Sequence, residues 1–297
     1  MNISIIGPGA IGSLWAIKLS QAGHNVSLWS RSTDNSIDVS LDRQTSLSFN
    51  NNNIEKLSES DLVIFTVKAW QVEEATTPLL QHLDPDTILM FMHNGMGAVD
   101  QITTQIDAHP VVLATTTQAA FKPNRNNVSH TGIGQTQLGA FNLKGQQCTF
   151  LVDVLEHALP AVSWNPEIKT ALWTKLAINC AINPLTGLEQ IKNGELADKR
   201  FSEVLSSIIK ELIQVMQAEG ITCSFDELET SVNKVIQATA KNNSSMKQDV
   251  FYQRKTEIDF ITGHLIKTAR KHQIEVPVNQ KLFDQVKERE NSWNHQD

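Results

Sequence analysis

A lysine and two asparagines recur every four residues in a segment that is otherwise almost wholly apolar. They are Lys175, Asn179 and Asn183, within "ALWTKLAINCAINP" (171–184). Because four residues are just over one helical turn, a helix would stack the three side chains along one face. In the simplest interpretation the ammonium extends to solvent and the amides bond to neighbouring loops. Alternatively, the stripe lines a cleft between two domains, where the lysine donates a proton and the amides hold a polar substrate or a nicotinamide.

A glycine-rich turn near the start of the chain predicts a nucleotide site. The segment "GPGAIG" is a GxGxxG motif between an apolar run, which predicts a strand, and residues 11–22, which suit a helix. In such a turn the first glycine permits the bend, the second lets a pyrophosphate approach, and the third allows helix–strand packing. The helix N-terminus also favours phosphate. A purely structural turn is the alternative. The candidate cofactor residues are Gly7, Pro8, Gly9, Ala10, Ile11 and Gly12.

The end of the second predicted strand bears on the choice between NADP and NAD. Arg31 follows "NVSLWS" there, where an NAD-binding protein usually has an acidic residue on the ribose. A guanidinium suits a 2′-phosphate in charge and in bidentate geometry. We therefore expect NADPH. A solvated loop arginine, with Asp34 as a ribose ligand, is the alternative.

Two further polar residues each follow an apolar run of the strand type. Lys68 ends "DLVIFTVK" and Asn94 ends "TILMFMHN". Ligands of open α/β sheets bind beyond the carboxyl ends of the strands, so both side chains are expected to face the cofactor. An ordinary turn residue is the alternative at each position.

A carboxylate in the last third of the chain is the candidate partner of the lysine. Glu257, in "RKTEIDFITGHLI", shares a helical register with Ile261 and Leu265, which places it at the edge of an apolar face of a helix predicted over 246–272. An ordinary solvated glutamate is the alternative. Ser245 and Gln248 fit a capping box before this helix, and the same helix start suits a substrate carboxylate.

The order of elements predicts two domains. Residues 1–165 alternate buried-type strands with helices, as in a doubly wound Rossmann-type α/β domain, although 33–60 shows no firm pattern. Residues 166–297 are expected to form an all-α substrate domain. Pro184 is expected to end its first helix and Gly220 its second. The predicted helices cover 167–183, 200–219, 225–241 and 246–272.

The totals limit the classes of protein. The chain has 297 residues, 40% of them hydrophobic, and a net charge of -7, which argues against a nucleic-acid partner. The three cysteines are widely spaced and form no CxxC pair, so we expect reduced thiols and no metal site. The N-terminus lacks the features of a signal peptide, and no apolar run reaches the length of a membrane span. We expect a cytoplasmic protein with a small-molecule substrate.

Seven motifs together resemble the ketopantoate reductase (2-dehydropantoate 2-reductase) family. They occur in the family's order over nearly the whole chain: "GPGAIG", "VKAWQ", "HNGMG", "LWTKLAINCAINPLT", "NGEL", "NNSSM" and "RKTEIDFITGHL". The fourth and the last two are specific, whereas the glycine turn is shared by many families. The resemblance implies a Rossmann domain, a helical domain like the C-terminal part of 6-phosphogluconate dehydrogenase, and a monomer or homodimer.

The same resemblance implies an activity and a role for each candidate residue. The activity is NADPH-dependent reduction of 2-dehydropantoate to (R)-pantoate, on the route to pantothenate and coenzyme A. Lys175 would be the general acid and Glu257 its acidic partner, as the two catalytic residues. Arg31, Lys68 and Asn94 would contact the cofactor. The substrate contacts implied are Asn94, Lys175, Asn179, Asn183, Asn193, Asn242 and Ser245.

Two other functions stay open at this point. One is a related reductase for 2-keto or hydroxy acids, or an opine-type dehydrogenase, which substrate choice would distinguish. The other is a non-catalytic NADPH-binding redox sensor. A sensor would keep the glycine turn and Arg31 but would not need the pair Lys175 and Glu257.

Overall fold

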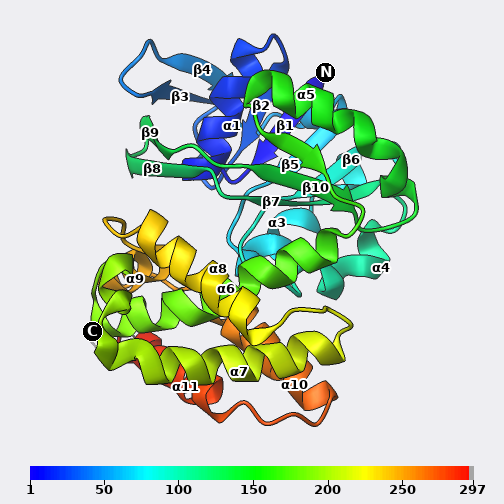
Figure 1. The fold of residues 1–297 in the computed structure, drawn as a ribbon. Coiled ribbons are helices and arrows are strands. Elements are labelled where there is room, and N and C mark those ends of the chain that lie inside the picture. Colours follow the sequence, from blue (N-terminus) through cyan, green and yellow to red (C-terminus); the bar gives the residue numbers. More distant parts are fainter. Residues whose placement is uncertain (294–297) are drawn as a thin grey trace. The chain divides into compact units, whose positions relative to one another are not determined.

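The computed structural model describes residues 1–293, which divide into two compact units. The first unit comprises Met1–His93 and Ala98–Ile168. The second comprises the short segment Asn94–Gly97 and the chain from Lys169 onward. Both units are drawn in Figure 1.

The first unit is built on a seven-stranded sheet in the order β11-β10-β7-β6-β5-β1-β2. Neighbours from β2 to β7 pair in parallel, whereas β10 runs antiparallel to β7. The central strands are buried along their length because both faces are covered, which is why they read as unbroken apolar runs. The strands are β1 (Asn2–Ile6), β2 (Asn25–Trp29), β5 (Leu62–Phe65), β6 (Ile88–Phe91), β7 (Val111–Thr116), β10 (Thr136–Ala140) and β11 (Val162–Trp164).

Helices cover this sheet, and the predicted doubly wound order is confirmed. The chain leaves β1 for β2 on one side and later returns to β5 on the other, so the strand order reverses beside β1. Dinucleotides bind at such a reversal in doubly wound folds. The α-helices are α1 (Ala10–Gln21), α2 (Ile54–Ser58), α3 (Val72–Thr76), α4 (Thr103–Ile106) and α5 (Leu151–Ala158).

A second, four-stranded sheet in the order β4-β3-β9-β8 was not predicted. Two of its strands lie in the stretch 33–60, for which the sequence predicts no firm structure, and the other two form a hairpin. Its clearest signal was present: Ile37, Val39 and Leu41 alternate with less apolar residues and are buried. The strands are β3 (Ser36–Leu41), β4 (Leu47–Asn50), β8 (Ala119–Asn124) and β9 (Asn127–Gly132).

The second unit is helical, as predicted, but its first helix is longer than expected. The helix α6 spans Ile168–Glu189 and continues through Pro184, so the prediction that this proline ends it was wrong. Packing on both sides of the proline holds the helix: Leu185 is buried in the core, and the Thr186 hydroxyl bonds Ser244 Oγ at 2.7 Å. Local propensity disfavours such a proline, but tertiary contacts override it here.

The single helix predicted over 246–272 is two helices. They are α9 (Ser245–Phe251) and α10 (Thr262–Lys271), separated by an irregular segment in which Gln253 has φ of +51°. Glu257 therefore lies before a short 3-10 turn (Ile258–Phe260) and not on a helical face. The apolar residues in register with it recur at helical spacing because they are buried in the core of the second unit.

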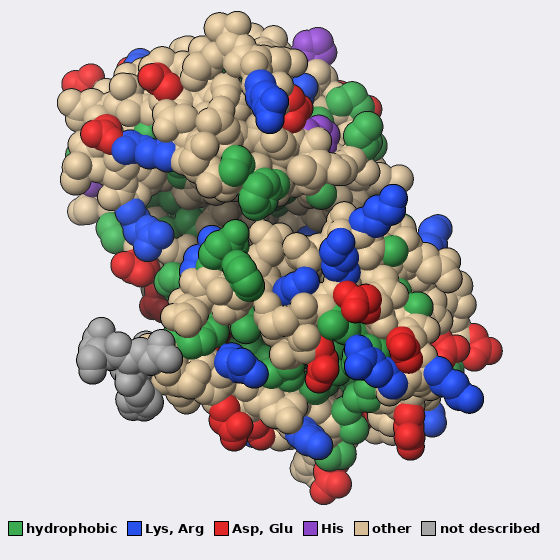
Figure 2. Space-filling model, turned by 90° about the vertical axis from the view of Figure 1, so that its left-hand side faces the viewer, with side chains coloured by type: hydrophobic (Ala, Val, Ile, Leu, Met, Phe, Trp, Pro, Cys, Tyr) green, Lys and Arg blue, Asp and Glu red, His purple; other side chains and the backbone are tan. Residues whose placement is uncertain are grey.

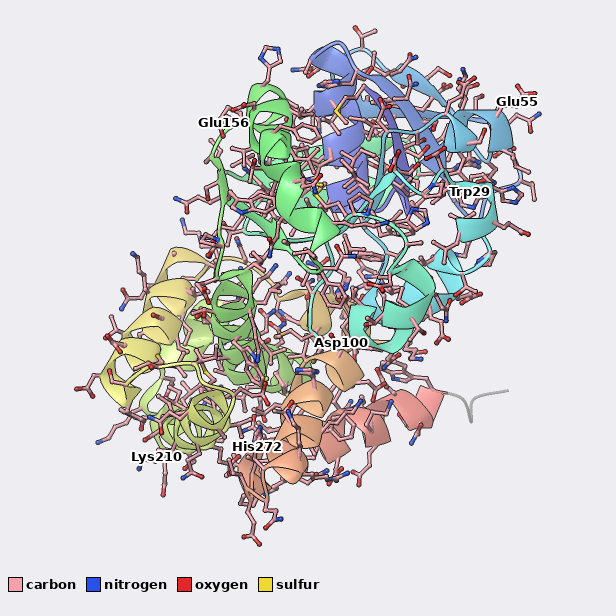
Figure 3. All side chains as sticks on the ribbon, turned by 90° about the vertical axis from the view of Figure 1, so that its right-hand side faces the viewer. Trp29, Glu55, Asp100, Glu156, Lys210 and His272 are labelled. Atoms are coloured by element: carbon pink, nitrogen blue, oxygen red, sulfur yellow. The ribbon has the colours of Figure 1, made fainter. Side chains whose placement is uncertain are left out.

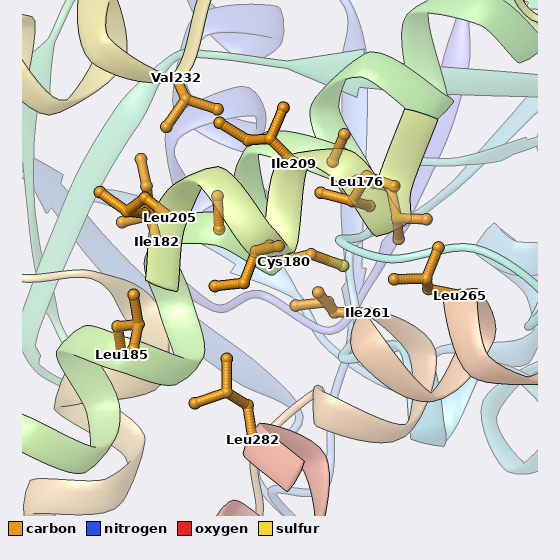
Figure 4. Packing of buried hydrophobic residues seen from close by; sticks show 14 of the residues in the cluster. Leu176, Cys180, Ile182, Leu185, Leu205, Ile209, Val232, Ile261, Leu265 and Leu282 are labelled. Atoms are coloured by element: carbon orange, nitrogen blue, oxygen red, sulfur yellow. The ribbon is translucent and has the colours of Figure 1, made fainter. Parts of the chain in front are cut away.

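In the part of the chain that the structure describes, this unit has three more α-helices: α7 (Ser202–Ala218), α8 (Phe225–Ala238) and α11 (Pro277–Trp293). The first two match the predictions, and Gly220 has the positive φ (+81°) of a helix-ending glycine. The helix α11 was not predicted, although Pro277 stands at its first position. The helices of this unit share one hydrophobic core. Figure 4 shows part of it, where Leu176 and Cys180 of α6 lie in the same cluster as Ile209 and Leu265.

The C-terminal end of α7 carries a charge cluster that should stabilise this unit. Glu219 accepts hydrogen bonds from His272 (2.7 Å), Lys169 (2.9 Å) and Lys271 (3.1 Å), and His272 is marked in Figure 3. The hydrogen bond from His272 is the main cause that lowers the pKa of Glu219 to about 2. The fold therefore favours the ionised carboxylate.

Replacing Glu219 by glutamine should lower the free energy of unfolding by about 1–2 kcal/mol at pH 7. Because the folded-state pKa is depressed, the contribution is complete above the unfolded value and fades as the pH falls from about 4.5 towards 2. Urea titrations at pH 7 and pH 3 measure this, with the exposed Glu203→Gln on α7 as the control. An equal loss at both pH values would contradict the role of the charge.

Basic and acidic side chains are interspersed over the face drawn in Figure 2. Within residues 1–293, no helix is both long enough and apolar enough to span a membrane.

Candidate functional site

The glycine turn joins β1 to α1 and is held by the strands on either side of it. The amide of Gly7 donates to the carbonyl of Trp29 at the end of β2 (2.9 Å). From beyond β5, the hydroxyl of Thr66 donates to the carbonyl of Gly7 at 2.8 Å. Gly9 precedes α1, and no side chain of the described residues caps the helix at this position. The first-turn N–H groups of α1 are thus suited to an external acceptor such as phosphate.

The three glycines of the turn have different surroundings, and these fit a dinucleotide. A Cβ on Gly7, which has φ of +82°, would lie 2.5 Å from Val67 Cγ1. A Cβ on Gly12 would lie 2.3 Å from Thr66 Oγ1. By contrast, the nearest heavy atom to a Cβ on Gly9 would be the Gly7 carbonyl oxygen at 3.9 Å. Gly7 and Gly12 are therefore required by the fold itself, whereas the space over Gly9 is open for a pyrophosphate.

Arg31 and Lys68 lie at the carboxyl edge of the same sheet. Arg31 is exposed two residues after β2, and Lys68 is half-buried three residues after β5. The backbone amide of Lys68 donates to Gln71 Oε1 at 3.3 Å. The structure places both residues on the side of the glycine turn, since the flanking strands are parallel neighbours of β1. Their roles as cofactor contacts stay predictions.

Two basic residues near this edge were missed by the sequence analysis. Lys122, on β8, donates to the carbonyl of Pro8 in the glycine turn at 2.6 Å. Arg125, in the turn between β8 and β9, donates to Ser32 Oγ at 2.6 Å and pairs with Asp34. The only sequence signal was a basic pair in a polar stretch, and it did not show which strands lie beside it.

The polar stripe lies on α6 as predicted, along one face of a continuous helix. Lys175 and Asn179 are half-buried and Asn183 is buried, while their apolar neighbours form the core of the second unit. Burial lowers the pKa of Lys175 to about 8, and the charge of Glu257 opposes part of this shift. An ammonium with a pKa near the working pH is suited to general acid catalysis.

Asn94 and Glu257, 163 residues apart in the chain, are brought together in the second unit. The Asn94 amide donates to Glu257 Oε2 at 3.4 Å, and the glutamate is buried. Backbone packing enforces this contact: the Met96 amide donates to the carbonyl of Phe260 at 2.8 Å. A Cβ on Gly95 would lie 2.4 Å from that same carbonyl oxygen. Only glycine allows the segment after Asn94 to approach so closely.

The remaining predicted polar residues fall into two groups. Asn193 is buried and lies beside Asn242, since its amide donates to the Asn242 carbonyl at 3.1 Å. Ser245 is exposed and is the first residue of α9. The prediction that Ser245 caps this helix was wrong, because Ser244 does so by accepting a bond from the Lys247 amide at 3.0 Å. Ser244 is the capping residue because it is buried against α6, where its hydroxyl bonds that of Thr186 at 2.7 Å.

The arrangement defines a class of protein: an oxidoreductase with a dinucleotide-binding α/β unit and a helical unit that holds a lysine near a buried carboxylate. More specifically, the chain belongs to the ketopantoate reductase family. Residues 3–142 match the family model "Ketopantoate reductase PanE/ApbA", and residues 167–290 match the model of its C-terminal part. The predicted family and fold class are confirmed.

Individual sequence relatives and solved structures agree with this assignment. The chain is 53% identical over 293 residues to a 2-dehydropantoate 2-reductase of Vibrio cholerae, covering 99% of both chains. Among solved structures, it resembles a ternary complex of D-mandelate dehydrogenase with NADH and anilino(oxo)acetate (TM-score 0.91, 22% identity, 99% and 100% of the two chains). It also resembles a dimeric ketopantoate reductase from Staphylococcus aureus (TM-score 0.84, 23% identity, 98% and 99% of the chains).

Proposed function

We propose that this protein reduces the C2 ketone of 2-dehydropantoate to the alcohol of pantoate, with NADPH as the reductant. The 53% identity to the Vibrio cholerae 2-dehydropantoate 2-reductase over the full chain carries this proposal. The half-buried lysine with a lowered pKa beside a buried glutamate supports it chemically. A redox sensor would need neither feature, and the membership of a reductase family argues against one.

Lys175 is the proton donor in this proposal. Hydride addition builds negative charge on the ketone oxygen, and a positioned ammonium stabilises that charge and then protonates the oxygen. Glu257 keeps the lysine charged by its own negative charge, which raises the lysine pKa against the effect of burial. Asn94, hydrogen-bonded to this glutamate, presents an amide to the reacting groups.

The other polar residues bind the rest of the substrate. Asn179 and Asn183 extend the lysine's face of α6 and offer both donors and acceptors to the hydroxyl and carboxylate groups. The exposed Ser245 at the start of α9 suits the carboxylate. Asn193 and Asn242 form the outer contacts.

NADPH, when bound, supplies the hydride. The turn Gly7–Gly12 would hold its pyrophosphate, Arg31 the 2′-phosphate, and Lys68 and Asn94 the nicotinamide end. We propose further that the protein works in the cytoplasm and assembles as a monomer or homodimer. The dimeric Staphylococcus aureus structure of the same fold supports the homodimer.

The function is tested by following NADPH oxidation with 2-dehydropantoate as substrate, beside NADH and beside unbranched 2-keto acids. Fast turnover with NADPH and 2-dehydropantoate, and slow turnover in each other combination, is the expected result. Efficient turnover of another keto acid with none of 2-dehydropantoate would assign the protein a different substrate.

The rate of reduction should fall at alkaline pH. The reduction needs protonated Lys175, whose pKa is lowered to about 8, so the rate should be level below that pH and drop about tenfold per unit well above it. Oxidation of pantoate needs the neutral amine and should rise with pH up to the same point. Pre-steady-state rates in both directions measure these limbs. Identical pH profiles for the two directions would contradict the assignment of the proton donor.

A further inference from the structure

The hairpin β8–β9 carries a cation into the glycine turn. Lys122 Nζ donates to the carbonyl of Pro8 (2.6 Å) and to Ser13 Oγ (2.8 Å), and both acceptors are neutral. Burial is the main cause that lowers the pKa of Lys122 to about 8, and the charge of Arg125 lowers it further. Among residues 1–293 no carboxylate pairs with this ammonium, and a partly desolvated ammonium of this kind costs free energy, which a bound anion would offset.

The tip of the same hairpin carries a second cation to the loop after β2. Arg125 Nη2 donates to Ser32 Oγ at 2.6 Å and pairs with Asp34. In dinucleotide-binding folds the residues after the second strand meet the adenosine ribose. A lone carboxylate there would favour the 2′-hydroxyl of NADH and repel a 2′-phosphate. Arg125 neutralises that carboxylate and holds its pKa below the usual value.

The hairpin is anchored in this place by bonds that do not involve the two cations. Asn124 Oδ1 accepts from the amides of Asn126 (3.1 Å) and Asn127 (3.0 Å), which closes the turn around Arg125. The strand β9 pairs with β3 at Ser40 and Leu41, and both strands of the hairpin pack against α1, as Figure 1 shows. The two basic side chains are therefore presented from a fixed element.

We propose that the β8–β9 hairpin binds the phosphates of the cofactor: Lys122 binds the pyrophosphate, and Arg125 binds the 2′-phosphate together with Arg31. The proposal rests on the proposed function only in taking a dinucleotide as the ligand. The proposal also bears on whether Asp34 favours NADH as a ribose ligand. Because Arg125 compensates the negative charge of this carboxylate, Asp34 no longer favours NADH over NADPH.

The test compares dissociation constants of NADPH and NADH, measured by nicotinamide fluorescence without any keto acid. Lys122→Met should weaken both nucleotides about tenfold, because both contain the pyrophosphate, and Lys122→Arg should restore most of the affinity. Arg125→Gln should weaken NADPH about tenfold and leave NADH within twofold. The matched control is Lys56→Gln, an exposed lysine of the same unit, which should change neither.

Three outcomes would overturn the proposal. An unchanged affinity in Lys122→Met with a lowered melting temperature would make that lysine a support of the turn only. Equal effects of Arg125→Gln on NADPH and NADH, or none, would make its ion pair an ordinary surface pair. Failure of the unmodified protein to bind either nucleotide would remove the ligand itself. Since no turnover is measured, the hairpin assignment can stand even if 2-dehydropantoate proves not to be the substrate.

Discussion

Replacing Lys175 by alanine should lower kcat by a factor on the order of 10² to 10⁴, the range for loss of a general acid. The ammonium is the group placed to protonate the new alkoxide, and water replaces it poorly because water is a far weaker acid than an ammonium whose pKa is about 8. The dissociation constant of NADPH should stay within about threefold, because the residues expected to bind the dinucleotide's phosphates lie in the other unit.

Two comparisons make this result specific. Lys210→Ala removes an exposed lysine from α7 of the same unit (Figure 3) and should leave kcat unchanged. Glu257→Gln should keep the protein folded but lower the pKa of Lys175 further, so that the alkaline limb of the reduction rate moves to lower pH. Steady-state kinetics and melting temperatures of all three variants measure these effects. A Lys175→Ala variant with turnover near that of the unmodified protein would exclude the lysine as proton donor.

The second large effect is a contrast between two glycines of the same turn. Gly9→Ala should fold with unchanged stability, since its Cβ would meet no atom nearer than 3.9 Å, yet weaken NADPH on the order of tenfold by filling the space for the pyrophosphate. Gly12→Ala should instead destabilise the protein by about 3 kcal/mol, because its Cβ would lie 2.3 Å from Thr66 Oγ1 and 2.7 Å from the Gly7 carbonyl.

Melting temperature and NADPH affinity, measured on both variants, separate the two effects. Gly23→Ala serves as the control, because its Cβ would meet open space and its positive φ adds only backbone strain. If Gly9→Ala bound NADPH as tightly as the unmodified protein, the pyrophosphate would have to lie elsewhere.

The sheet and the helical unit were predictable because their signals are local. Unbroken apolar runs mark strands that are covered on both faces, and the glycine turn needs only six consecutive residues. The stripe of Lys175, Asn179 and Asn183 follows from the pitch of a helix alone. These features require no knowledge of which segments meet.

The errors arose where tertiary packing overrules local preference. We expected Pro184 to end a helix, but α6 continues through it because packing around Leu185 stabilises the residues that follow. The segment around Glu257 has helical spacing but is irregular, because the carboxylate is buried against Asn94. In each case a contact between distant residues stabilises a backbone that the local sequence disfavours.

By itself, then, the sequence determined the two kinds of fold, the dinucleotide turn, the family and the identity of the candidate proton donor. Only the tertiary structure decided that Asn94 contacts Glu257, that Ser244 and not Ser245 caps α9, and that Lys122 reaches the glycine turn. The reason is physical. Periodicity and turn chemistry are properties of neighbouring residues. By contrast, the bonds that fix these three features, Asn94 with Glu257, Ser244 with Thr186 and Lys122 with Pro8, join positions 58 to 163 residues apart, so their pairing depends on how the whole chain packs.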